Sequence, residues 1–345
     1  MKKEELIQTI QLLLNFNKRV KGQLNASIIE EIVMDTLPTL PVELSGEESK
    51  EIVSELILRN SHSIDRDKTL VNNEGHEDWL IGERKKEWFY WSRYERYLEM
   101  KLSNNLVVER LDESTDEVLG LFEDPERDGA WDRRGLIVGH VQSGKTSHYS
   151  GLICKAADAG YKIIIVLAGM HNNLRVQTQI RLEEAFLGFN TDTKGGEYTR
   201  VGVGLDDGRM EMLPNTLTTR KENGDFTTAQ ANRVSVGPEE KPWLFVIKKN
   251  KTVLKKLLNW IGSFHVSNGE GVVTRFPLLL IDDEADHASV DTGDVTYIDG
   301  SPDENYEPRA INSLIRQILK SFQKSAFVGY TATPFANVFL KRQNE

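Results

Sequence analysis

The stretch GHVQSGKT, residues 139–146, decides how the rest of this chain is interpreted. It fits the spacing Gly-x-x-x-x-Gly-Lys-Thr, in which glycines let the backbone curl so that its N–H groups face a phosphate. The apolar run Leu136–Val138 before it is typical of a strand, and Ser147–Ala159 after it has helical periodicity. Strand, loop and helix in this order predict a phosphate-binding loop, because the helix N-terminus adds positive potential.

The motif assigns roles to its residues. We expect Lys145 to reach the β- and γ-phosphates of a nucleoside triphosphate, and the Thr146 hydroxyl to ligate Mg²⁺. The predicted nucleotide-binding residues are Gly139, His140, Val141, Gln142, Ser143, Gly144, Lys145 and Thr146. The alternative is a glycine-rich turn that fits the pattern by chance, and the flanking strand and helix argue against it.

A second apolar run, Pro277–Ile281, ends in the acidic residues 282–286, DDEAD. Ligands of open α/β sheets bind at the carboxyl edge of the strands, so these carboxylates are expected near the phosphate loop. We assign Asp283 to the metal ion and Glu284 to the water that attacks the γ-phosphate. Lys145 and Glu284 are thus the predicted catalytic residues, while Asp282 leaves the register open by one residue.

A third signal is FVGYTATPF, residues 327–335, in which an apolar strand ends in hydroxyl residues. Such side chains can hydrogen-bond the carboxylate cluster and respond to the γ-phosphate. Thr331 and Thr333 are therefore the predicted coupling residues.

The second half of the chain alternates short apolar runs with helical segments. This pattern predicts an α/β fold with a parallel sheet of about five core strands. The predicted strands are Gly135–Gly139, Lys162–Ala168, Leu244–Ile247, Leu278–Ile281 and Ala326–Tyr330. We expect a mainly helical N-terminal domain over 1–130 and the sheet domain over 131–345, with a loop-rich insertion near 189–241.

One predicted helix, Glu83–Leu102, is rich in aromatic and basic residues. Its Trp and Tyr side chains recur at a spacing of three or four, as in a helix that packs in a core. A basic-aromatic strip for nucleic acid is the alternative interpretation.

Composition limits the class of protein. The net charge is −10, so the chain lacks the global basic footprint of a nucleic-acid binder, although local basic strips are compatible with it. Cys154 is the single cysteine, which excludes a disulfide framework and a thiolate metal cluster and favours the cytoplasm. The longest apolar runs are too short to span a membrane.

The three motifs, in this order, resemble motifs I, II and III in the first RecA-like lobe of superfamily 2 helicases and translocases. The resemblance covers about 135–340 and implies a DEAD-like P-loop ATPase that uses ATP and Mg²⁺. It also implies that strand 326–330 lies between the phosphate-loop strand and the DEAD strand. ATP in preference to GTP rests on this resemblance, because no adenine-reading glutamine motif is identified.

A more specific resemblance extends upstream. Residues 131–186, which begin WDRRGLIVGHVQSGKT, resemble the bacterial Z-one (Z1) domain family, as do STDEVLGLFEDP at 114–125 and IDDEADHASVDT at 281–292. That family is named for endonuclease activity and occurs in restriction-modification and phage-defence systems. The resemblance implies a nuclease, methyltransferase or Hsp90-type ATPase as a partner. The residues themselves do not support the nuclease part of that name, because they form no convincing Asp…Glu-x-Lys constellation and no His/Cys metal set.

The helicase resemblance also suggests nucleic-acid contacts. AGMHNNLRVQTQ, residues 168–179, resembles motif Ia, and VIKKNKTVLKK, residues 246–256, falls where the superfamily contacts the DNA backbone. The candidate contacts are Asn172, Asn173, Arg175, Gln177, Lys248 and Lys249. The alternatives are helix N-capping by an asparagine and a solvated helix face.

We therefore expect the motor lobe of a helicase- or translocase-like ATPase that acts on DNA in a bacterial defence or restriction system. Because the chain stops at Glu345, shortly after the third motif, we expect a second RecA-like lobe in a longer protein and poor activity without it. The alternative is a nucleotide-gated switch or scaffold that recruits a partner nuclease without translocation.

Overall fold

The fold is that of a computed structural model of residues 1–345. The residues that it describes are Leu6, Thr9, Ile10, Leu13, Leu14, 26–40, Ser49, Ile52, Val53, Leu56, 75–85, 88–102, 105–138, 144–192, 199–205, 212–231, 241–263, 272–285, 297–298, 301–302 and 307–331.

The chain divides into two compact units, residues 1–71 with 141–144 and residues 72–140 with 145–345. In the first unit, α2 (Ala26–Thr36) is followed by the short helix η1 (Leu37–Thr39). Its apolar core contains Leu6, Ile10, Leu14, Ile29, Val33, Ile52, Val53 and Leu56. The second unit begins near residue 72, so the predicted boundary at 130 is too late.

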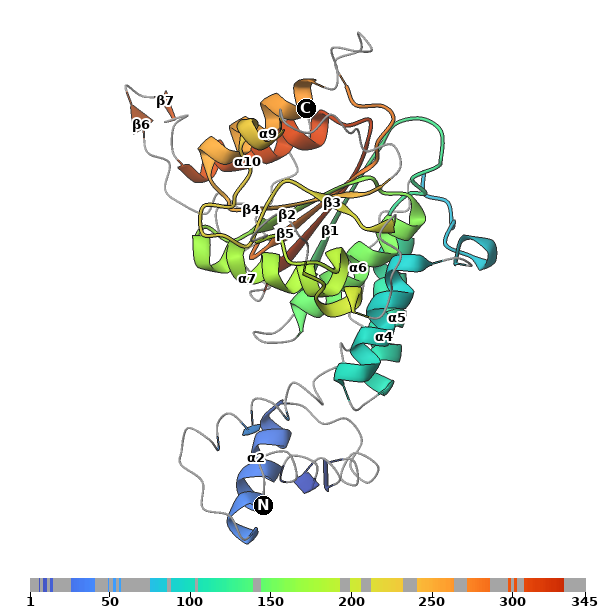
Figure 1. Cartoon of the computed structure of the whole chain (residues 1–345), viewed down its shortest axis with the longest axis vertical. Helices are drawn as coiled ribbons and strands as arrows, with labels where there is room; N and C mark the ends of the chain where they lie inside the picture. Colours follow the sequence, from blue (N-terminus) through green and yellow to red (C-terminus); the bar gives the residue numbers. More distant parts are fainter. Residues whose placement is uncertain are drawn as a thin grey trace. The chain divides into compact units, whose positions relative to one another are not determined.

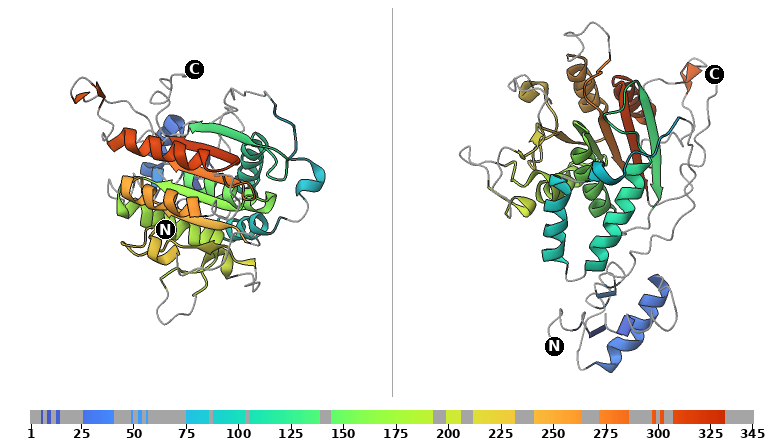
Figure 2. Two further views of the ribbon diagram at one scale, coloured as in Figure 1. Left: turned by 90° about the horizontal axis from the view of Figure 1, so that it is seen from above. Right: turned by 90° about the vertical axis from the view of Figure 1, so that its right-hand side faces the viewer.

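The boundary moves because two helices upstream of 130 pack against the sheet unit. The short helix η2 (Gly82–Lys85) precedes α4 (Phe89–Lys101) and α5 (Asn105–Gly120), and both α4 and α5 lie along α6 (Lys145–Ala159). Figures 1 and 2 show this group of three helices from three directions. The predicted helix Glu83–Leu102 contains α4, which begins later, at Phe89. Helical periodicity carries no information about the partner that covers a helix.

The second unit is built on a six-stranded sheet in the order β1-β8-β5-β2-β4-β3, with every pairing parallel. The strands are β1 (Trp131–Val138), β2 (Ile163–Ala168), β3 (Asn215–Thr216), β4 (Trp243–Ile247), β5 (Leu278–Asp283) and β8 (Lys324–Thr331). The predicted α/β class is confirmed, as is the implied position of β8 between β1 and β5. A separate pair, β6 (Tyr297–Ile298) and β7 (Ser301–Pro302), is antiparallel.

Helices cover both faces of the sheet (Figure 1). α6 and α7 (Asn172–Leu182) lie on one face, and α9 (Lys251–Ser263) and α10 (Glu307–Lys320) lie on the other. Because successive strand residues point to opposite faces, the strands divide their side chains between two cores. Thus Leu279 and Ile281 of β5 join the α6 core, while Leu278 and Leu280 join the α9–α10 core.

The aromatic helix α4 is a core helix, which settles its two interpretations. Tyr90, Trp91 and Tyr94 are buried against α6. The Asp158 carboxylate, from the end of α6, accepts hydrogen bonds from the first backbone N–H groups of α4, at Phe89, Tyr90 and Trp91. The buried Lys155 ammonium lies 4.3 Å from the Trp91 ring centroid. These three aromatic side chains therefore pack inside the protein, as the core interpretation predicted, whereas Trp88, Phe89 and Tyr97 are partly buried at its edge.

Part of the predicted insertion 189–241 belongs to the sheet unit. β3 pairs with β4, and the backbone N–H of Val246 in β4 donates to Thr218 Oγ1. After the four-residue helix α8 (Thr228–Ala231) the chain enters β4, and the Phe226 ring packs on Trp260 of α9 at 5.6 Å between centroids. Residues 193–198, 206–211 and 232–240 lie outside the described residues.

Among the described residues, no helix is long and apolar enough to cross a membrane.

Candidate functional site

The described part of the GHVQSGKT stretch is its last three residues. Gly144 has φ +75°, a left-handed conformation that favours glycine, and α6 begins directly after it at Lys145. Lys145 and Thr146 therefore lie in the first turn of a helix that follows β1, as the phosphate-loop interpretation requires. Gly139, His140, Val141, Gln142 and Ser143 lie outside the described residues.

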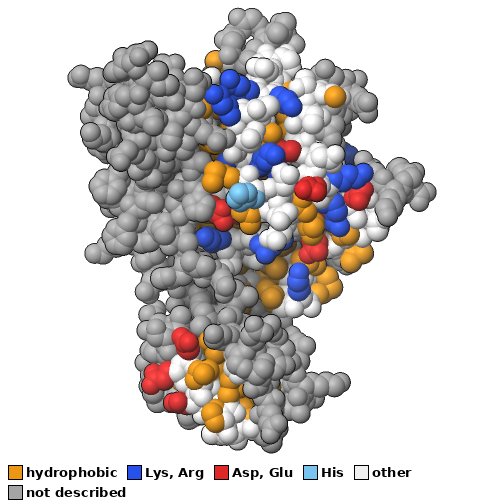
Figure 3. Space-filling view, turned by 90° about the vertical axis from the view of Figure 1, so that its left-hand side faces the viewer, with side chains coloured by type: hydrophobic (Ala, Val, Ile, Leu, Met, Phe, Trp, Pro, Cys, Tyr) orange, Lys and Arg blue, Asp and Glu red, His pale blue; other side chains and the backbone are white. Residues whose placement is uncertain are grey.

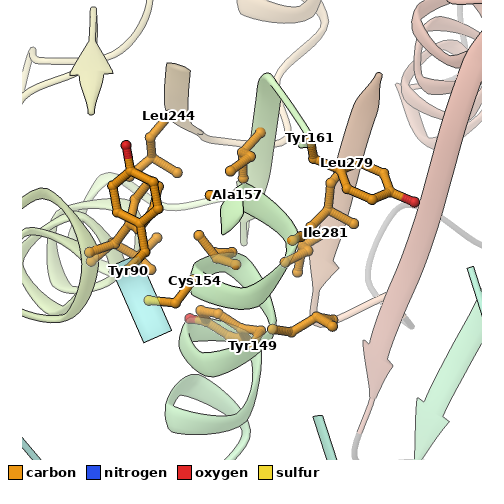
Figure 4. Close-up of a cluster of buried hydrophobic side chains, with 14 of the residues drawn as sticks. Tyr90, Tyr149, Cys154, Ala157, Tyr161, Leu244, Leu279 and Ile281 are labelled. Carbon is orange, nitrogen blue, oxygen red and sulfur yellow. The ribbon is translucent and has the colours of Figure 1, made fainter. Parts of the chain in front are cut away.

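The carboxyl end of β5 separates its two aspartates onto opposite faces of the sheet. Because side chains alternate along a strand, Asp283 lies on the same face of β5 as Leu279 and Ile281, which pack against α6. Tyr149 of α6 donates a hydrogen bond to the Asp283 carboxylate at 3.2 Å. Figure 4 shows Tyr149 in one cluster with Leu279 and Ile281. Asp282 has the opposite parity and forms an ion pair with Lys249 at 2.5 Å. Of the two aspartates between which the sequence left the register open, Asp283 is the one on the α6 side.

The groups around Asp283 shift the pKa of its carboxyl in both directions. Burial raises the pKa of the Asp283 carboxyl, and the negative charge of Glu284 adds to this, whereas the Tyr149 hydrogen bond and the charges of Lys145 and Lys249 oppose it. Burial also raises the pKa of Tyr149 above its usual range, so that its hydroxyl stays a donor at neutral pH. A carboxylate at this position is a candidate ligand for a cation, whose charge would favour the ionised form.

Glu284 occupies an unusual backbone conformation. Its φ is +60°, and it is the one described residue other than glycine with a positive φ. Non-glycine residues in this region are uncommon and conformationally costly, so the surrounding structure must hold the turn. The Lys249 ammonium donates to the Glu284 carbonyl oxygen at 2.5 Å, and the next backbone N–H, of Ala285, donates to Tyr330 O at 2.8 Å.

The third motif joins this network through β8. The Tyr330 hydroxyl lies 2.9 Å from His148 Nδ1, so β8 contacts α6 as well as the turn at Glu284 and Ala285. Burial lowers the pKa of His148 to about 4, so the imidazole is neutral at pH 7. Thr331, at the end of β8, is buried, and Thr333 lies outside the described residues.

An arginine of α7 that was not among the predicted site residues donates a hydrogen bond to the first turn of α6. Arg181, in the last turn of α7, donates from Nη1 to Thr146 Oγ1 at 2.8 Å. No motif identifies it, because it stands 35 residues beyond Thr146 and meets it only through the packing of α7 beside α6. The hydroxyl predicted to ligate Mg²⁺ is therefore also a hydrogen-bond acceptor for a guanidinium.

Two of the predicted nucleic-acid contacts are wrong. Arg175 is 0% exposed and donates to the carbonyl oxygens of Thr219, at 2.9 Å, and Lys221. Lys249 is 2% exposed and forms the ion pair with Asp282. Both side chains point into the protein because their backbone positions face packed elements, which the basic character of the segments did not reveal.

The other candidates lie nearer the surface. Lys248 donates to Asn172 Oδ1 at 3.0 Å, and Asn173 and Gln177 are exposed. The N-cap of α7 is His171, without a side-chain capping bond, so the N-capping interpretation of the asparagines is also wrong. On the face drawn in Figure 3, basic side chains are spread among acidic, apolar and uncharged ones.

The residues present are compatible with a nucleotide and its metal ion. The described residues contain no group of three or more His, Cys, Asp or Glu side chains that could hold a metal by themselves. Mg²⁺ in phosphate-loop sites is held by one or two protein oxygens, with water and phosphate oxygens completing the shell. The Thr146 hydroxyl and the Asp283 carboxylate are oxygens of the kind that such a site uses.

No protein-family model, curated protein or solved structure matches the chain.

Proposed function

We propose that this protein is a P-loop ATPase with a RecA-like lobe of the superfamily 2 type, which binds ATP with Mg²⁺ and hydrolyses it. The proposal is carried by one observation: Lys145 begins the helix after β1, and Asp283 ends β5, the second neighbour of β1, on the face that α6 covers. The order of the motifs along the chain and the position of β8 between β1 and β5 both agree with what the helicase resemblance implies.

The roles of the residues follow from this arrangement. Lys145 and the N-terminus of α6 bind phosphate oxygens by charge and by backbone N–H groups. Thr146 and Asp283 would hold a Mg²⁺ ion, which would supply positive charge to neutralise the phosphates. Glu284 accepts a proton from the water that attacks the terminal phosphorus, and the bond to the bridging oxygen of the leaving diphosphate breaks.

The test measures nucleotide binding and turnover separately. The wild-type protein is expected to bind ATP in the presence of Mg²⁺, and Lys145→Ala is expected to lose most of that affinity in isothermal titration calorimetry. Glu284→Gln is expected to retain the affinity while its turnover falls by about 100-fold or more. Absence of ATP binding by the wild type would overturn the proposal, and normal turnover in Glu284→Gln would remove Glu284 from its role.

The substrate class proposed for the motor is DNA, as in the resemblance to helicases and to the Z-one family. Phosphate contacts would come from the exposed Asn173 and Gln177, with Lys248 after exchange of its Asn172 bond. ATPase assays of the protein with and without single- and double-stranded DNA test this part. Identical turnover in all arms would contradict it without affecting the ATPase proposal.

A nucleotide-gated switch or scaffold remains the second candidate, and the burial of Arg175 and Lys249 favours it because the candidate DNA surface loses two cations. Pull-down with a non-hydrolysable ATP analogue and with ADP discriminates between the two functions. Partner capture that depends on the analogue, together with DNA-independent turnover, supports the switch; equal capture with both nucleotides contradicts it.

A further inference from the structure

The turn after β4 carries two adjacent lysines with different surroundings. Lys248 is partly exposed and donates to Asn172, whereas the Lys249 side chain is 0% exposed and faces an Asp282 side chain that is also 0% exposed. Removing two charges from water is costly, and a buried ion pair is weak evidence for stabilisation. The position of Lys249 therefore calls for an explanation beyond stability.

The explanation lies in what else Lys249 touches. Its ammonium donates to the main-chain oxygen of Glu284 at 2.5 Å, and its own backbone N–H donates to Gly169 O at 2.8 Å. Gly169 has φ +59°, and a Cβ built on it would lie 3.3 Å from Glu284 Oε2. The ends of β2, β4 and β5 thus meet at the Glu284 turn.

This turn is restrained from two sides. Lys249 holds the carbonyl of Glu284, and the backbone of Tyr330 in β8 accepts the N–H of Ala285. Because the left-handed conformation of Glu284 is intrinsically unfavourable, loss of one restraint permits the residue to relax toward an ordinary conformation and re-aim its side chain.

We propose that Lys249 is a positioning residue: its buried ammonium fixes the backbone of Glu284 and thereby aims the carboxylate at the attacking water. Asp282 compensates the charge of Lys249 inside the protein. The inference rests on the proposed ATPase function, since Glu284 is its general base. A displacement of about 1 Å at a reacting group can cost about 100-fold in rate, so the effect is expected in turnover and not in nucleotide affinity.

The experiment compares two variants of the full chain that differ in the Lys249 bond. Asp282→Asn keeps the ammonium on Glu284, whereas Lys249→Met with Asp282→Asn removes the ammonium and the charge that needs it. The double variant is expected to bind Mg²⁺·ATP within about threefold of Asp282→Asn, while its turnover is lower by about 10-fold or more. Lys249→Met with Asp282→Leu repeats the removal with an apolar partner, which buried pairs often tolerate, in case the first double variant does not fold.

A readout that a merely structural role would not move is the coupling with Glu284. In a Glu284→Gln background the double substitution is expected to lower the residual turnover no further, because both changes act through one group. Turnover of a folded double variant within twofold of Asp282→Asn would overturn the inference, as would an undiminished decrease in the Glu284→Gln background. If the wild type binds no ATP, the proposed function fails first; if it binds and hydrolyses ATP but Lys249 has no effect, only this inference fails.

Discussion

Asp282 and Asp283 are neighbours at the end of β5, yet they belong to different environments. Asp283 lies on the α6 side with a hydrogen bond from Tyr149, close to Lys145. Asp282 lies on the opposite side in an ion pair with Lys249, where both side chains are 0% exposed. The two carboxylates are chemically identical, so the difference between a candidate metal ligand and a structural counter-charge comes from strand parity alone.

The same contrast holds for the lysines that face them. Lys145 lies in the first turn of α6, at a helix end that attracts anions. Lys249 is enclosed and donates to a carboxylate and a backbone carbonyl. Lys145 and Asp283 are therefore the candidates for a ligand-binding role, whereas the charges of Lys249 and Asp282 compensate each other.

The largest expected effect is the loss of folding stability when the buried Lys249 is substituted. Lys249→Met leaves Asp282 as a buried charge without its ion-pair partner, so the free energy of unfolding is expected to fall by about 3–5 kcal/mol. Urea unfolding measures it, with Lys255→Met on the exposed side of α9 as the control, expected to change by less than about 0.5 kcal/mol. Equal stability of the two variants would contradict the burial of the Lys249 charge.

The next largest effect is a difference in ATP turnover between variants of Asp283 and of Asp282. Asp283→Asn is expected to lower Mg²⁺-dependent ATP turnover by about 100-fold or more, because a ligand for the cation loses its charge. Asp282→Asn is expected to affect stability more than turnover, since the Lys249 bond to Glu284 remains. A steady-state assay of both variants decides, and the reverse pattern would assign the metal to Asp282.

A smaller effect is the pH dependence of folding stability that arises from His148 in α6. Burial lowers the pKa of His148 to about 4, from about 6.5 for an unperturbed histidine, so the unfolded chain binds more protons between these two pH values. This contribution to stability is therefore complete above about pH 6.5 and is lost as the pH falls. From pH 7 to pH 5 the loss is about 2 kcal/mol.

The control for this prediction is the variant His148→Gln. Burial raises the pKa of Asp158 to about 7, so that group contributes in the opposite direction, with stability falling as pH rises from 4 to 7. The difference between wild type and His148→Gln in urea unfolding at each pH isolates the histidine. A difference that does not vary between pH 7 and pH 5 would show that the His148 pKa is not lowered.

The smallest expected effect concerns the hydroxyl that faces Asp283. Tyr149→Phe removes one hydrogen bond, worth about 1 kcal/mol, and so lowers turnover by about tenfold or less. The bond also opposes the raised pKa of Asp283, so its loss is expected to move the acid limb of the turnover profile to higher pH. Tyr90→Phe, whose hydroxyl donates to Met212 O at 2.9 Å, is the matched control; identical profiles for both variants would exclude the Tyr149 effect.

Much of the fold could be predicted because the signals are local. The apolar runs of β2 and β4 are buried at every position, so composition identifies them without knowledge of their neighbours. The domain boundary could not be predicted in the same way. The aromatic surface of α4 matches α6, which lies more than 40 residues downstream, and periodicity shows that a helix has an apolar side but not what covers it.

The residues of the candidate site also differ in whether local sequence could predict them. Lys145, Thr146, Asp283 and Glu284 follow from motif spacing, because a phosphate loop requires a lysine and a hydroxyl at set positions before a helix. Arg175 and Lys249 were misassigned because a basic residue after a strand has the same appearance in sequence whether its side chain reaches solvent or a buried acceptor. Arg181 was missed because its partner lies on another helix.

By itself, the sequence determined the alternation of strands and helices, the helix that follows β1 and the acidic end of β5, since each is written in consecutive residues. Only the tertiary structure decided that Asp283 and not Asp282 is the aspartate on the α6 side and that Lys249 donates to the Glu284 carbonyl, whereas it confirmed the position of β8 between β1 and β5 that the helicase resemblance implied. The physical reason is that strand order, the relation of a strand face to its covering helix, and the burial of a charge all depend on contacts between distant segments.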